Sequence, residues 1–353
     1  MASRKELGRR LLQFLFDYPA ASWHQSKIEK AVIFTPESIG DAMAIFPVIR
    51  SLQAYGCASI YIVCSSRSRV VFEGVSDRFN VFSVQHDRDY ISVMQVARAI
   101  RRHSGGIDLC VDCTASTSSS IYFLGTLRSA TNICCNETSM RAFNAQLPVS
   151  FIREKGHTSR PIWWREAMVK LGFPAVDSHF EFPLVDTTRL NVEGWLKRFS
   201  EWCVINSEGA IPRRSLSLET MREVIGLVRE ETSIPILLPF TEQSFGKACR
   251  LRSEFSGVYV YPDQSSIADT AIMVKGARFV ISPDTAVVHI SSAFNRPTIG
   301  FYLDASPPWL PLSSNVRVVL CEGSVNNSTD LVGIKEFIRA TFHTGSSRHH
   351  TPL

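Results

Sequence analysis

Two polar turns in this chain combine residue types that suit the handling of a charged group. The first turn, Ser282–Thr285, follows the apolar run Phe279–Ile281 and precedes a helix-like segment, Ala286–Phe294. A strand that ends in such a turn at a helix start presents free backbone N–H groups and the positive end of the helix dipole to its guest. The pattern therefore indicates an anion site for a group such as a nucleotide diphosphate. The alternative is an ordinary βαβ unit with Thr285 as a helix cap.

The second turn lies nearer the N-terminus and carries a single carboxylate. Residues 36–41, "PESIGD", follow the apolar run Ala31–Thr35 and precede a segment with helical spacing, Ala42–Tyr55. A carboxylate at the end of a strand can accept a proton from a hydroxyl group that attacks an electrophilic carbon. Asp41 is therefore a candidate general base, and a role as a helix cap is its alternative.

Together the two turns resemble the motifs of one enzyme family. It is the ADP-heptose:lipopolysaccharide heptosyltransferase family, family nine of the glycosyltransferases, which has the GT-B fold. The first family motif is a loop ending in Gly-Asp with a proline six residues after the aspartate, here Gly40, Asp41 and Pro47. The second runs from Asp-Thr-Gly through a histidine and a small-residue helix to Pro-Thr, here Asp284, Thr285, His289, Ser291, Ala293, Pro297 and Thr298. Ala286 replaces the family's glycine.

The resemblance implies a fold and an activity. The fold is α/β, with two doubly wound Rossmann-like domains facing across a cleft. The activity is the inverting transfer of heptose from ADP-heptose to a lipopolysaccharide inner-core acceptor, with Asp41 removing the acceptor proton. The nucleotide sugar and the anionic glycolipid would be the partners, and no metal or other cofactor is expected. The DxD pattern Asp87–Asp89, which holds a metal in the other major glycosyltransferase fold, is common by chance and is discounted.

The resemblance also assigns the donor side. Arg214 takes the place of a family lysine that neutralises leaving-group charge, and an arginine can bind phosphate in a bidentate manner. Leu216 and Ser217 depart from the Trp-Pro that usually follows. Glu242 follows "IPILLPF", where a family glutamate meets the ribose hydroxyls. The remaining donor-binding candidates are Ser207 as a hydroxyl donor, Asp284 near the sugar, Thr285 and Ala286 at the diphosphate, and His289, which either touches phosphate or buttresses the loop.

Four basic residues are candidates for the acceptor side. Arg67 and Arg69 follow the second predicted strand, on the same edge as Asp41, where they would meet phosphate or sugar carboxylate. His157 and Arg160 are the other two. Surface solvation is the alternative for Arg67 and Arg69.

The elements that must position these residues repeat one βα pattern in both halves of the chain. In the first half the predicted strands are Ala31–Thr35, Ser59–Cys64, Val81–Val84, Leu109–Asp112 and Ala130–Cys134. A second series starts at Cys203 and ends with the Ser282–Thr285 turn and the helix after it. The expected boundaries are a basic amphipathic N-terminal helix at 1–27, an acceptor-binding domain at 28–180, a linker at 181–200, a nucleotide-sugar-binding domain at 201–342 and a disordered tail at 343–353.

Bulk composition limits the class of protein. The 353 residues carry a net charge of +5, which suits an anionic substrate or membrane surface and is too low to indicate nucleic-acid binding. Nine cysteines without a signal peptide indicate reduced thiols in a cytoplasmic protein, and no apolar stretch is long enough to span a bilayer. Leu7, Leu11, Phe14, Leu15 and Tyr18 form a helical stripe behind Arg4, Lys5, Arg9 and Arg10. This pattern fits either a helix on the inner membrane's cytoplasmic face or a helix packed on the protein body.

Two functions other than heptose transfer stay open, and a third is excluded. One is a GT-B glycosyltransferase with another nucleotide-sugar donor or a protein acceptor. Another is a catalytically silent homologue that binds a sugar nucleotide. A Rossmann dehydrogenase is excluded, because no Gly-x-Gly-x-x-Gly turn follows the first strand.

Overall fold

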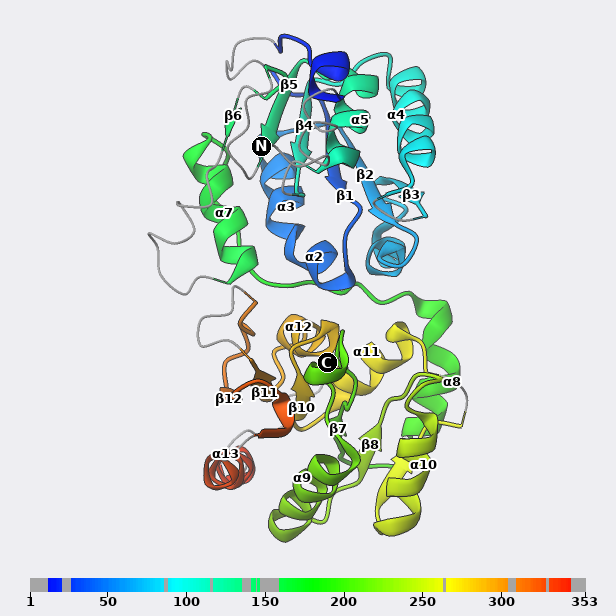
Figure 1. Ribbon diagram of the computed structural model, residues 1–353, viewed down its shortest axis with the longest axis vertical. Coiled ribbons are helices and arrows are strands. Elements are labelled where there is room, and N and C mark those ends of the chain that lie inside the picture. The colour runs from blue at the N-terminus through cyan, green and yellow to red at the C-terminus, as the bar shows by residue number, and fades with distance from the viewer. Residues whose placement is uncertain are drawn as a thin grey trace, which may run out of the picture. The chain divides into compact units, whose positions relative to one another are not determined.

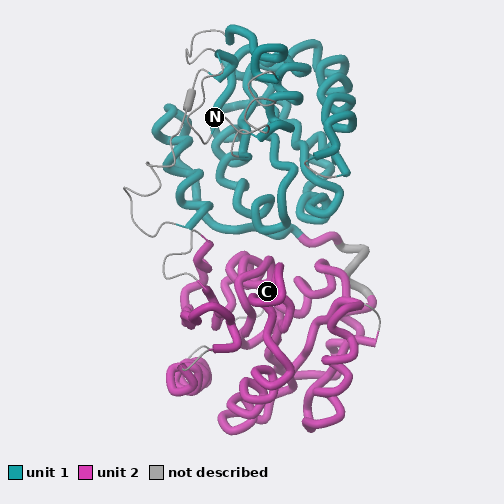
Figure 2. Tube along the Cα trace, viewed as in Figure 1, with its two compact units in different colours: residues 1–183 teal, residues 184–353 magenta. Residues whose placement is uncertain are grey.

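The protein consists of two compact units, residues 1–183 and 184–353, in the computed structural model (Figure 2). The structure describes residues 12–20, 27–85, 88–114, 117–134, 141–143, 145–146, 159–262, 265–303, 309–327 and 330–343. Each unit contains a six-stranded sheet whose strand pairs are all parallel. The predicted α/β class with two doubly wound units is therefore confirmed.

The first unit is built on a parallel sheet whose four central strands are buried on both faces. In spatial order they are β3 (Asn80–Val84), β2 (Ser59–Ser65), β1 (Lys30–Thr35), β4 (Leu109–Asp112), β5 (Thr131–Cys134) and β6 (Ala145–Gln146). Strand β1, "KAVIFT", is buried from its second residue onward, as expected for a central strand of a parallel sheet. The helices are α2 (Ile39–Ala44), α3 (Phe46–Tyr55), α4 (Tyr90–Ser104), α5 (Ser118–Leu127) and α7 (Arg160–Lys170), with a 3₁₀ segment η1 (Arg69–Val75) (Figure 1).

The described part of the N-terminal region packs against this first unit. Residues 12–16 are helical, and Leu12 and Phe16 contact the apolar core that Tyr18 completes. Tyr18 is 7% exposed and its hydroxyl donates to the Ser129 carbonyl at 3.0 Å. Residues 12–20 are thus part of the first unit and do not form a separate segment, whereas Phe14 remains 83% exposed.

The second unit repeats the architecture with shorter strands. In spatial order these are β12 (Val316–Leu320), β11 (Thr298–Tyr302), β10 (Val280–Pro283), β7 (Cys203–Ile205), β8 (Ile236–Leu238) and β9 (Val258–Val260). Its helices are α8 (Asp186–Leu196), α9 (Leu218–Glu231), α10 (Phe245–Glu254), α11 (Ile267–Gly276), α12 (Ala286–Ala293) and α13 (Leu331–His343), with 3₁₀ segments η2 (Pro212–Arg214) and η3 (Val325–Asn327) (Figure 1).

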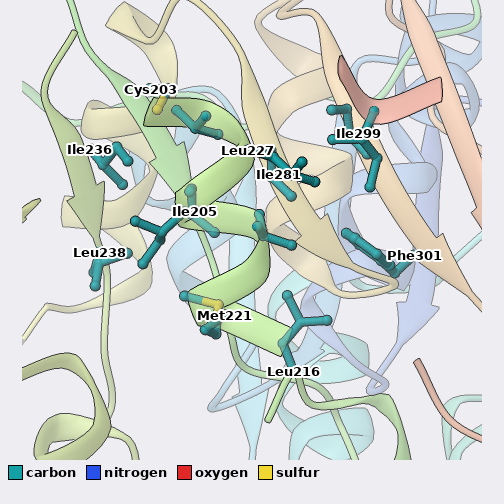
Figure 3. Close-up of a cluster of buried hydrophobic side chains, with 14 of the residues drawn as sticks. Cys203, Ile205, Leu216, Met221, Leu227, Ile236, Leu238, Ile281, Ile299 and Phe301 are labelled. Carbon is teal, nitrogen blue, oxygen red and sulfur yellow. The ribbon is translucent and has the colours of Figure 1, made fainter. Parts of the chain in front are cut away.

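A single apolar cluster holds helices against one face of the second sheet. Alternate strand residues such as Ile205, Ile281 and Phe301 belong to it, together with side chains of α9 (Figure 3). Side chains of α10 and α13 complete the cluster. Met221 on α9 is 1% exposed at the centre of this contact. Burial of these side chains supplies the main driving force for folding of the unit.

Each sheet has one position where the strand order reverses direction. In the first unit this position lies between β1 and β4, and in the second between β7 and β10. Doubly wound folds bind ligands outside the carboxyl ends of the strands at this point, because the two connecting chains diverge there. The turns that carry Asp41 and Thr285 follow β1 and β10, one at each reversal point.

Two predicted boundaries differ from the observed ones. The expected linker 181–200 contains helix α8, which packs against α11 within the second unit. The break between units falls after Pro183. The helix predicted over Ala42–Tyr55 is two helices, α2 and α3, separated at Ile45, with Pro47 in the first turn of α3. Proline suits that place because its missing N–H would have no helical partner there.

Candidate functional site

The reversal point of the second sheet brings two polar turns side by side. Strands β7 and β10 pair as far as Ile205 and Ile281, and the Asn206 N–H donates to the Ile281 carbonyl at 2.9 Å. Beyond this last rung, β7 continues into the polar loop 206–217 and β10 into the turn with Asp284 and Thr285. The sheet therefore gathers most of the donor candidates predicted from the sequence at one edge.

Thr285 is the N-cap residue of α12. Its backbone is extended and its Oγ1 accepts a hydrogen bond from the Val287 N–H at 3.3 Å. The cap leaves other N–H groups of the first helical turn directed outward at the positive end of the helix. The residue is only partly buried, so a ligand can reach it. Capping and anion binding are compatible at this position.

Alanine fits at position 286, where the family has glycine, without backbone strain. It is the first residue of α12, and it is absent from the positive-φ residues of the described chain, which among non-glycines are Arg128 and Asn295. Glycine is required only where φ is positive or where a methyl group would clash. The alanine methyl group is thus compatible with the helix start.

Asp284 and Arg214 form the charged pair of this edge. The Arg214 guanidinium lies 3.3 Å from an Asp284 carboxylate oxygen, and the side chains are 38% and 15% exposed. Burial raises the pKa of Asp284, and the Arg214 charge opposes that shift. Burial also raises the pKa of Tyr302 well above its usual value, with Asp284 adding to the effect. Because a guanidinium carries five N–H donors, Arg214 can contact Asp284 and still donate to an incoming anion.

The loop that carries Arg214 is held by its own backbone. Gly209 packs so closely that a Cβ added to it would overlap the Arg214 carbonyl group. The Gly209 N–H donates to Ser215 Oγ at 3.0 Å. From η3, the Asn326 amide donates to the Ser215 carbonyl at 3.1 Å, and its oxygen accepts from the Ser217 N–H at 2.7 Å. Arg214 is therefore presented from a fixed turn.

Ser207 and Glu242 occupy different environments. Ser207 is 6% exposed, and its hydroxyl lies 3.5 Å from a Glu208 carboxylate oxygen. Glu242 is exposed in the turn after β8. Glu208 reaches that same turn, because its other oxygen accepts from Thr241 Oγ1 at 3.4 Å. Glu208 therefore links the loop after β7 to the turn after β8 through its side-chain contacts.

Lys247 on α10 is the basic partner of Glu208. Its ammonium group donates to the Leu216 carbonyl at 2.9 Å and lies 3.8 Å from a Glu208 oxygen. Burial lowers the pKa of Lys247, and Glu208 opposes that shift. The pair ties the loop after β7 to the start of α10.

His289 lies inside the unit. It is 4% exposed, its ring centroid is 5.6 Å from that of Trp309, and burial lowers its pKa to about 4. The imidazole is therefore neutral near pH 7 and brings no positive charge to a phosphate. Its position favours the buttressing alternative.

In the first unit, Asp41 belongs to the short helix α2. It forms a capping box with Ser38, whose hydroxyl donates to an Asp41 carboxylate oxygen at 2.5 Å and whose backbone N–H donates to the same oxygen at 3.2 Å. Asp41 is partly buried, so it remains within reach of solvent. The capping role is thus present, and it holds the carboxylate in one orientation.

Arg67 and Arg69 lie at the same sheet edge as Asp41. Ser65 at the end of β2 donates through its hydroxyl to the Glu37 carbonyl at 2.9 Å, which joins the loop after β2 to the Asp41 loop. Both arginines are exposed, and Arg69 reaches Ser83 Oγ at 3.5 Å. Arg160, at the start of α7, stacks over the Trp163 ring at 5.0 Å. His157 lies outside the described residues.

A buried carboxylate also lies at the first reversal point. Asp112, the last residue of β4, is fully buried and accepts hydrogen bonds from the Thr114 N–H at 3.0 Å and the Thr114 hydroxyl at 2.7 Å. Burial raises its pKa to about 7. Thr114 in turn contacts Ser120 Oγ at 2.7 Å in the first turn of α5.

The sequence patterns do not single out Asn206, Glu208, Lys247 or Asp112. The first two stand in the same loop as Arg214, and their polarity directly after an apolar strand is a usable signal. Lys247 and Asp112 have no local signal of this kind. Asp112 is embedded in the apolar run "IDLCVDC", and Lys247 follows a polar turn on a helix.

Part of the second unit matches the model of a known family. Residues 222–334 match the model of glycosyltransferase family 9 (heptosyltransferase), a segment that includes Asp284, Thr285 and His289. The resemblance seen in the sequence motifs is thereby confirmed. The chain is also 28% identical over 229 residues to "Putative uncharacterized protein YeeL" of Escherichia coli strain K12, covering 63% of this chain and 98% of that protein.

Two comparisons concern named heptosyltransferases. Lipopolysaccharide heptosyltransferase 1 of Escherichia coli O18:K1:H7 is 32% identical over 123 residues, which is 34% of this chain and 37% of that protein. The structure "E. coli heptosyltransferase WaaC with ADP" superimposes with a TM-score of 0.66 at 19% identity and covers 88% of this chain and 99% of that one. At this identity the superposition shows a shared fold. Among the described helices, none is both long and apolar enough to cross a membrane.

Proposed function

We propose that this chain, whose residues 222–334 match the model of glycosyltransferase family 9, is a glycosyltransferase that moves heptose from ADP-heptose to the inner core of lipopolysaccharide with inversion at the anomeric carbon. One observation carries this proposal. The N-terminal end of α12 with Thr285, and the Arg214 guanidinium 3.3 Å from Asp284, meet at the reversal point of the second sheet. Helix start and cation together suit the two negative groups of a nucleotide diphosphate.

The proposed reaction is a direct displacement. The acceptor hydroxyl oxygen forms a bond to the anomeric carbon as the bond to the diphosphate oxygen breaks, and the hydroxyl proton passes to the Asp41 carboxylate. Negative charge grows on the departing diphosphate, where the Thr285 helix end and Arg214 stabilise it. Asp284, held by Arg214, accepts hydrogen bonds from sugar hydroxyls. The Ser38 contacts keep the Asp41 carboxylate oriented for the proton it accepts.

We propose that no metal takes part. The charge that a divalent cation would neutralise falls to Arg214 and to the helix dipole. Transfer measured in excess EDTA should therefore equal transfer in its absence. Activity that is abolished by EDTA and restored by Mg²⁺ would refute this part of the proposal.

The acceptor side points to an anionic glycolipid at a membrane surface. Arg67 and Arg69 are exposed at the Asp41 edge and suit phosphate or sugar carboxylates. Phe14 and Leu15 are 83% and 60% exposed on the helical segment 12–16, which follows a basic sequence. Exposed apolar residues beside basic ones favour peripheral contact with an anionic leaflet, here the cytoplasmic face of the inner membrane. The fraction of protein that sediments with anionic vesicles should fall when Phe14 and Leu15 are both replaced by Ser.

The variant Asp41→Asn tests the proposed base. Asparagine keeps an oxygen that can accept from the Ser38 N–H but cannot take the acceptor proton, so transfer should fall by about 10²–10⁴-fold. Product formation is measured by mass spectrometry of the glycolipid, and thermal melting of the variant checks the fold. Near wild-type turnover in a folded Asp41→Asn protein would remove Asp41 from the mechanism.

A second donor remains an explicit alternative because of Glu208. A carboxylate between the turns after β7 and β8 adds negative charge close to the proposed diphosphate site. A thermal-shift screen with ADP-, UDP-, GDP- and CMP-linked sugars decides among donors. Stabilisation by ADP-heptose alone supports the proposal, and stabilisation by a different nucleotide favours the alternative donor. A lack of any shift favours a silent homologue.

A further inference from the structure

The side chain of Asn206 joins the two turns of the proposed donor site. Asn206 is 4% exposed and directly follows β7, where the backbone ladder with β10 ends. Its amide nitrogen lies 3.0 Å from the Ser282 hydroxyl, 3.3 Å from Thr285 Oγ1 and 3.0 Å from the Glu208 carbonyl. The side chain thus continues the cross-strand hydrogen bonding past the last backbone rung.

The direction of these hydrogen bonds follows from neighbouring backbone N–H groups, which can only donate. The Glu208 backbone N–H donates to Asn206 Oδ1 at 3.1 Å, so the other end of the amide is the NH₂ group. The Val287 backbone N–H likewise donates to Thr285 Oγ1 at 3.3 Å. The NH₂ group has two protons, so one donates to the Glu208 carbonyl and the other is shared between Ser282 Oγ and Thr285 Oγ1. Thr285 Oγ1 therefore accepts from the Val287 N–H and from this shared Asn206 N–H, which occupy its two lone pairs.

With its lone pairs occupied, the Thr285 hydroxyl can form one more hydrogen bond, in which it donates its own proton. Ser282 Oγ, 3.2 Å away, is one acceptor for it. Ser282 already donates its proton to the Pro283 carbonyl at 2.8 Å and receives an Asn206 N–H, so it does not compete as a donor. An anionic oxygen at the start of α12 is a stronger acceptor than a neutral hydroxyl.

We propose that Asn206 is a positioning residue that makes Thr285 an obligate hydrogen-bond donor to the nucleotide diphosphate. The proposal rests on the proposed function of this edge and goes beyond it by explaining how a residue that does not touch the ligand controls phosphate affinity. An acceptor in place of the Asn206 NH₂ group would draw the Thr285 proton inward, away from the ligand.

Asn206→Asp tests this with little change in shape. The carboxylate keeps the acceptor for the Glu208 N–H and replaces both donated N–H bonds with acceptors. ADP affinity should fall about tenfold or more, the size expected for a lost hydrogen bond to a charged group. Adenosine, which lacks phosphate, should bind with unchanged affinity. Ligand-observed NMR measures both affinities. Asn206→Ala, which adds no charge, should lower the affinity for ADP less than Asn206→Asp does and should leave the affinity for adenosine unchanged.

A matched control and a double variant separate positioning from general damage. The side-chain amide of Asn327 is exposed and donates to the Glu322 carbonyl at 2.8 Å, so Asn327→Asp should leave ADP affinity unchanged. In a Thr285→Val background, Asn206→Asp should cost much less ADP affinity than in the wild type, because the two residues act through one hydroxyl. Thermal melting verifies that each variant is folded.

The outcomes distinguish this inference from the function it rests on. Wild-type protein that binds neither ADP nor adenosine overturns the proposed function. Wild-type protein that binds ADP, together with an Asn206→Asp variant of equal ADP affinity, overturns the role of Asn206 alone. Equal losses for ADP and adenosine, or additive losses with Thr285→Val, also overturn it and leave Asn206 as a purely structural residue.

Discussion

Single side chains at the carboxyl edges of the two sheets differ mainly in how their charge is handled. Arg214 and Asp284 compensate one another in a partly open position, whereas His289 and Asp112 are buried. Burial removes the charge from His289 and raises the pKa of Asp112 to about 7. Charge at these edges is thus retained only where a partner or solvent is available, which separates ligand-facing residues from supporting ones.

Replacement of Arg214 tests whether its charge acts on the leaving group. Arg214→Met should lower kcat by about 10²–10³-fold, the usual cost of one donor at developing negative charge. Arg214→Lys, which keeps the charge, should lose less. Arg213→Met provides the matched control, since Arg213 is an exposed neighbour in the same turn η2. Steady-state kinetics in which Arg214→Met and Arg213→Met behave alike would argue against this role.

The Asp112 carboxyl group should make stability depend on pH. Its pKa is about 7 in the folded protein and about 3.8 when unfolded. The folded state therefore binds the proton more tightly, and the stability from this group is complete below about pH 4 and lost as the pH rises to about 7. Asp112→Asn, which resembles the protonated form, should remove up to ~4 kcal/mol of this dependence.

Urea unfolding at pH 5 and pH 8 measures that effect. The free energy of unfolding of the wild type, relative to Asp112→Asn, should be lower at pH 8 than at pH 5. A difference between the two proteins that does not change with pH would show that the pKa of Asp112 is not raised.

At the scale of elements, turns rather than helices or strands define the site. The helix caps of α9, α11 and α12 are serine or threonine side chains that fix where each helix begins. The path of the loop between β7 and α9 depends instead on the close packing of Gly209 and on the hydrogen bond from the Asn326 side chain. Substitutions in this loop should therefore be costlier than those within the helices it joins.

Two glycine substitutions in the second unit test that contrast. Gly209→Ala places a methyl group against the Arg214 carbonyl, so the loop must shift and both stability and ADP affinity should fall. Gly226→Ala lies inside α9 with no heavy atom near the added Cβ, so stability should rise by about 0.5–1 kcal/mol with unchanged binding. Thermal melting and ADP titration compare them, and a harmless Gly209→Ala would contradict the close packing of this loop.

On the scale of the whole molecule, the chain contains the same sheet order twice. Each unit has its own parallel sheet and its own buried cluster, and each presents polar turns at a reversal point. Donor candidates are in the second unit and acceptor candidates in the first.

Hydrogen exchange with ADP should reveal that division of labour. Amides in residues 206–217 and 284–289 should show the largest slowing, because bound ligand stabilises the native state of these turns by mass action. Amides of β1, β4 and their following turns should change less. Slowing that is greatest around Asp41 would place the nucleotide in the first unit and overturn the donor assignment.

Much of the fold was predictable from the sequence because short local patterns of apolar residues specify its strands. Strand β4 occurs at the predicted residues, and β1 and β2 differ by one residue each, since apolar runs act over a few positions. Helix α8 lies in a stretch that was expected to be a linker, because its N-cap Val185 gives no capping signal. The turns at two helix starts likewise indicated Asp41 and Thr285, and the family resemblance indicated Arg214.

The sequence by itself determined the resemblance to glycosyltransferase family 9, the βα order and the residues whose chemistry suits sugar transfer. Only the tertiary structure decided which of them share a surface and in what ionisation state. Asn206 and Thr285 stand far apart in the chain and become hydrogen-bond partners because β7 and β10 are neighbours in the sheet. His289 loses its charge because α12 turns it inward. Strand order and burial arise from packing of the whole unit, which no short window of sequence contains.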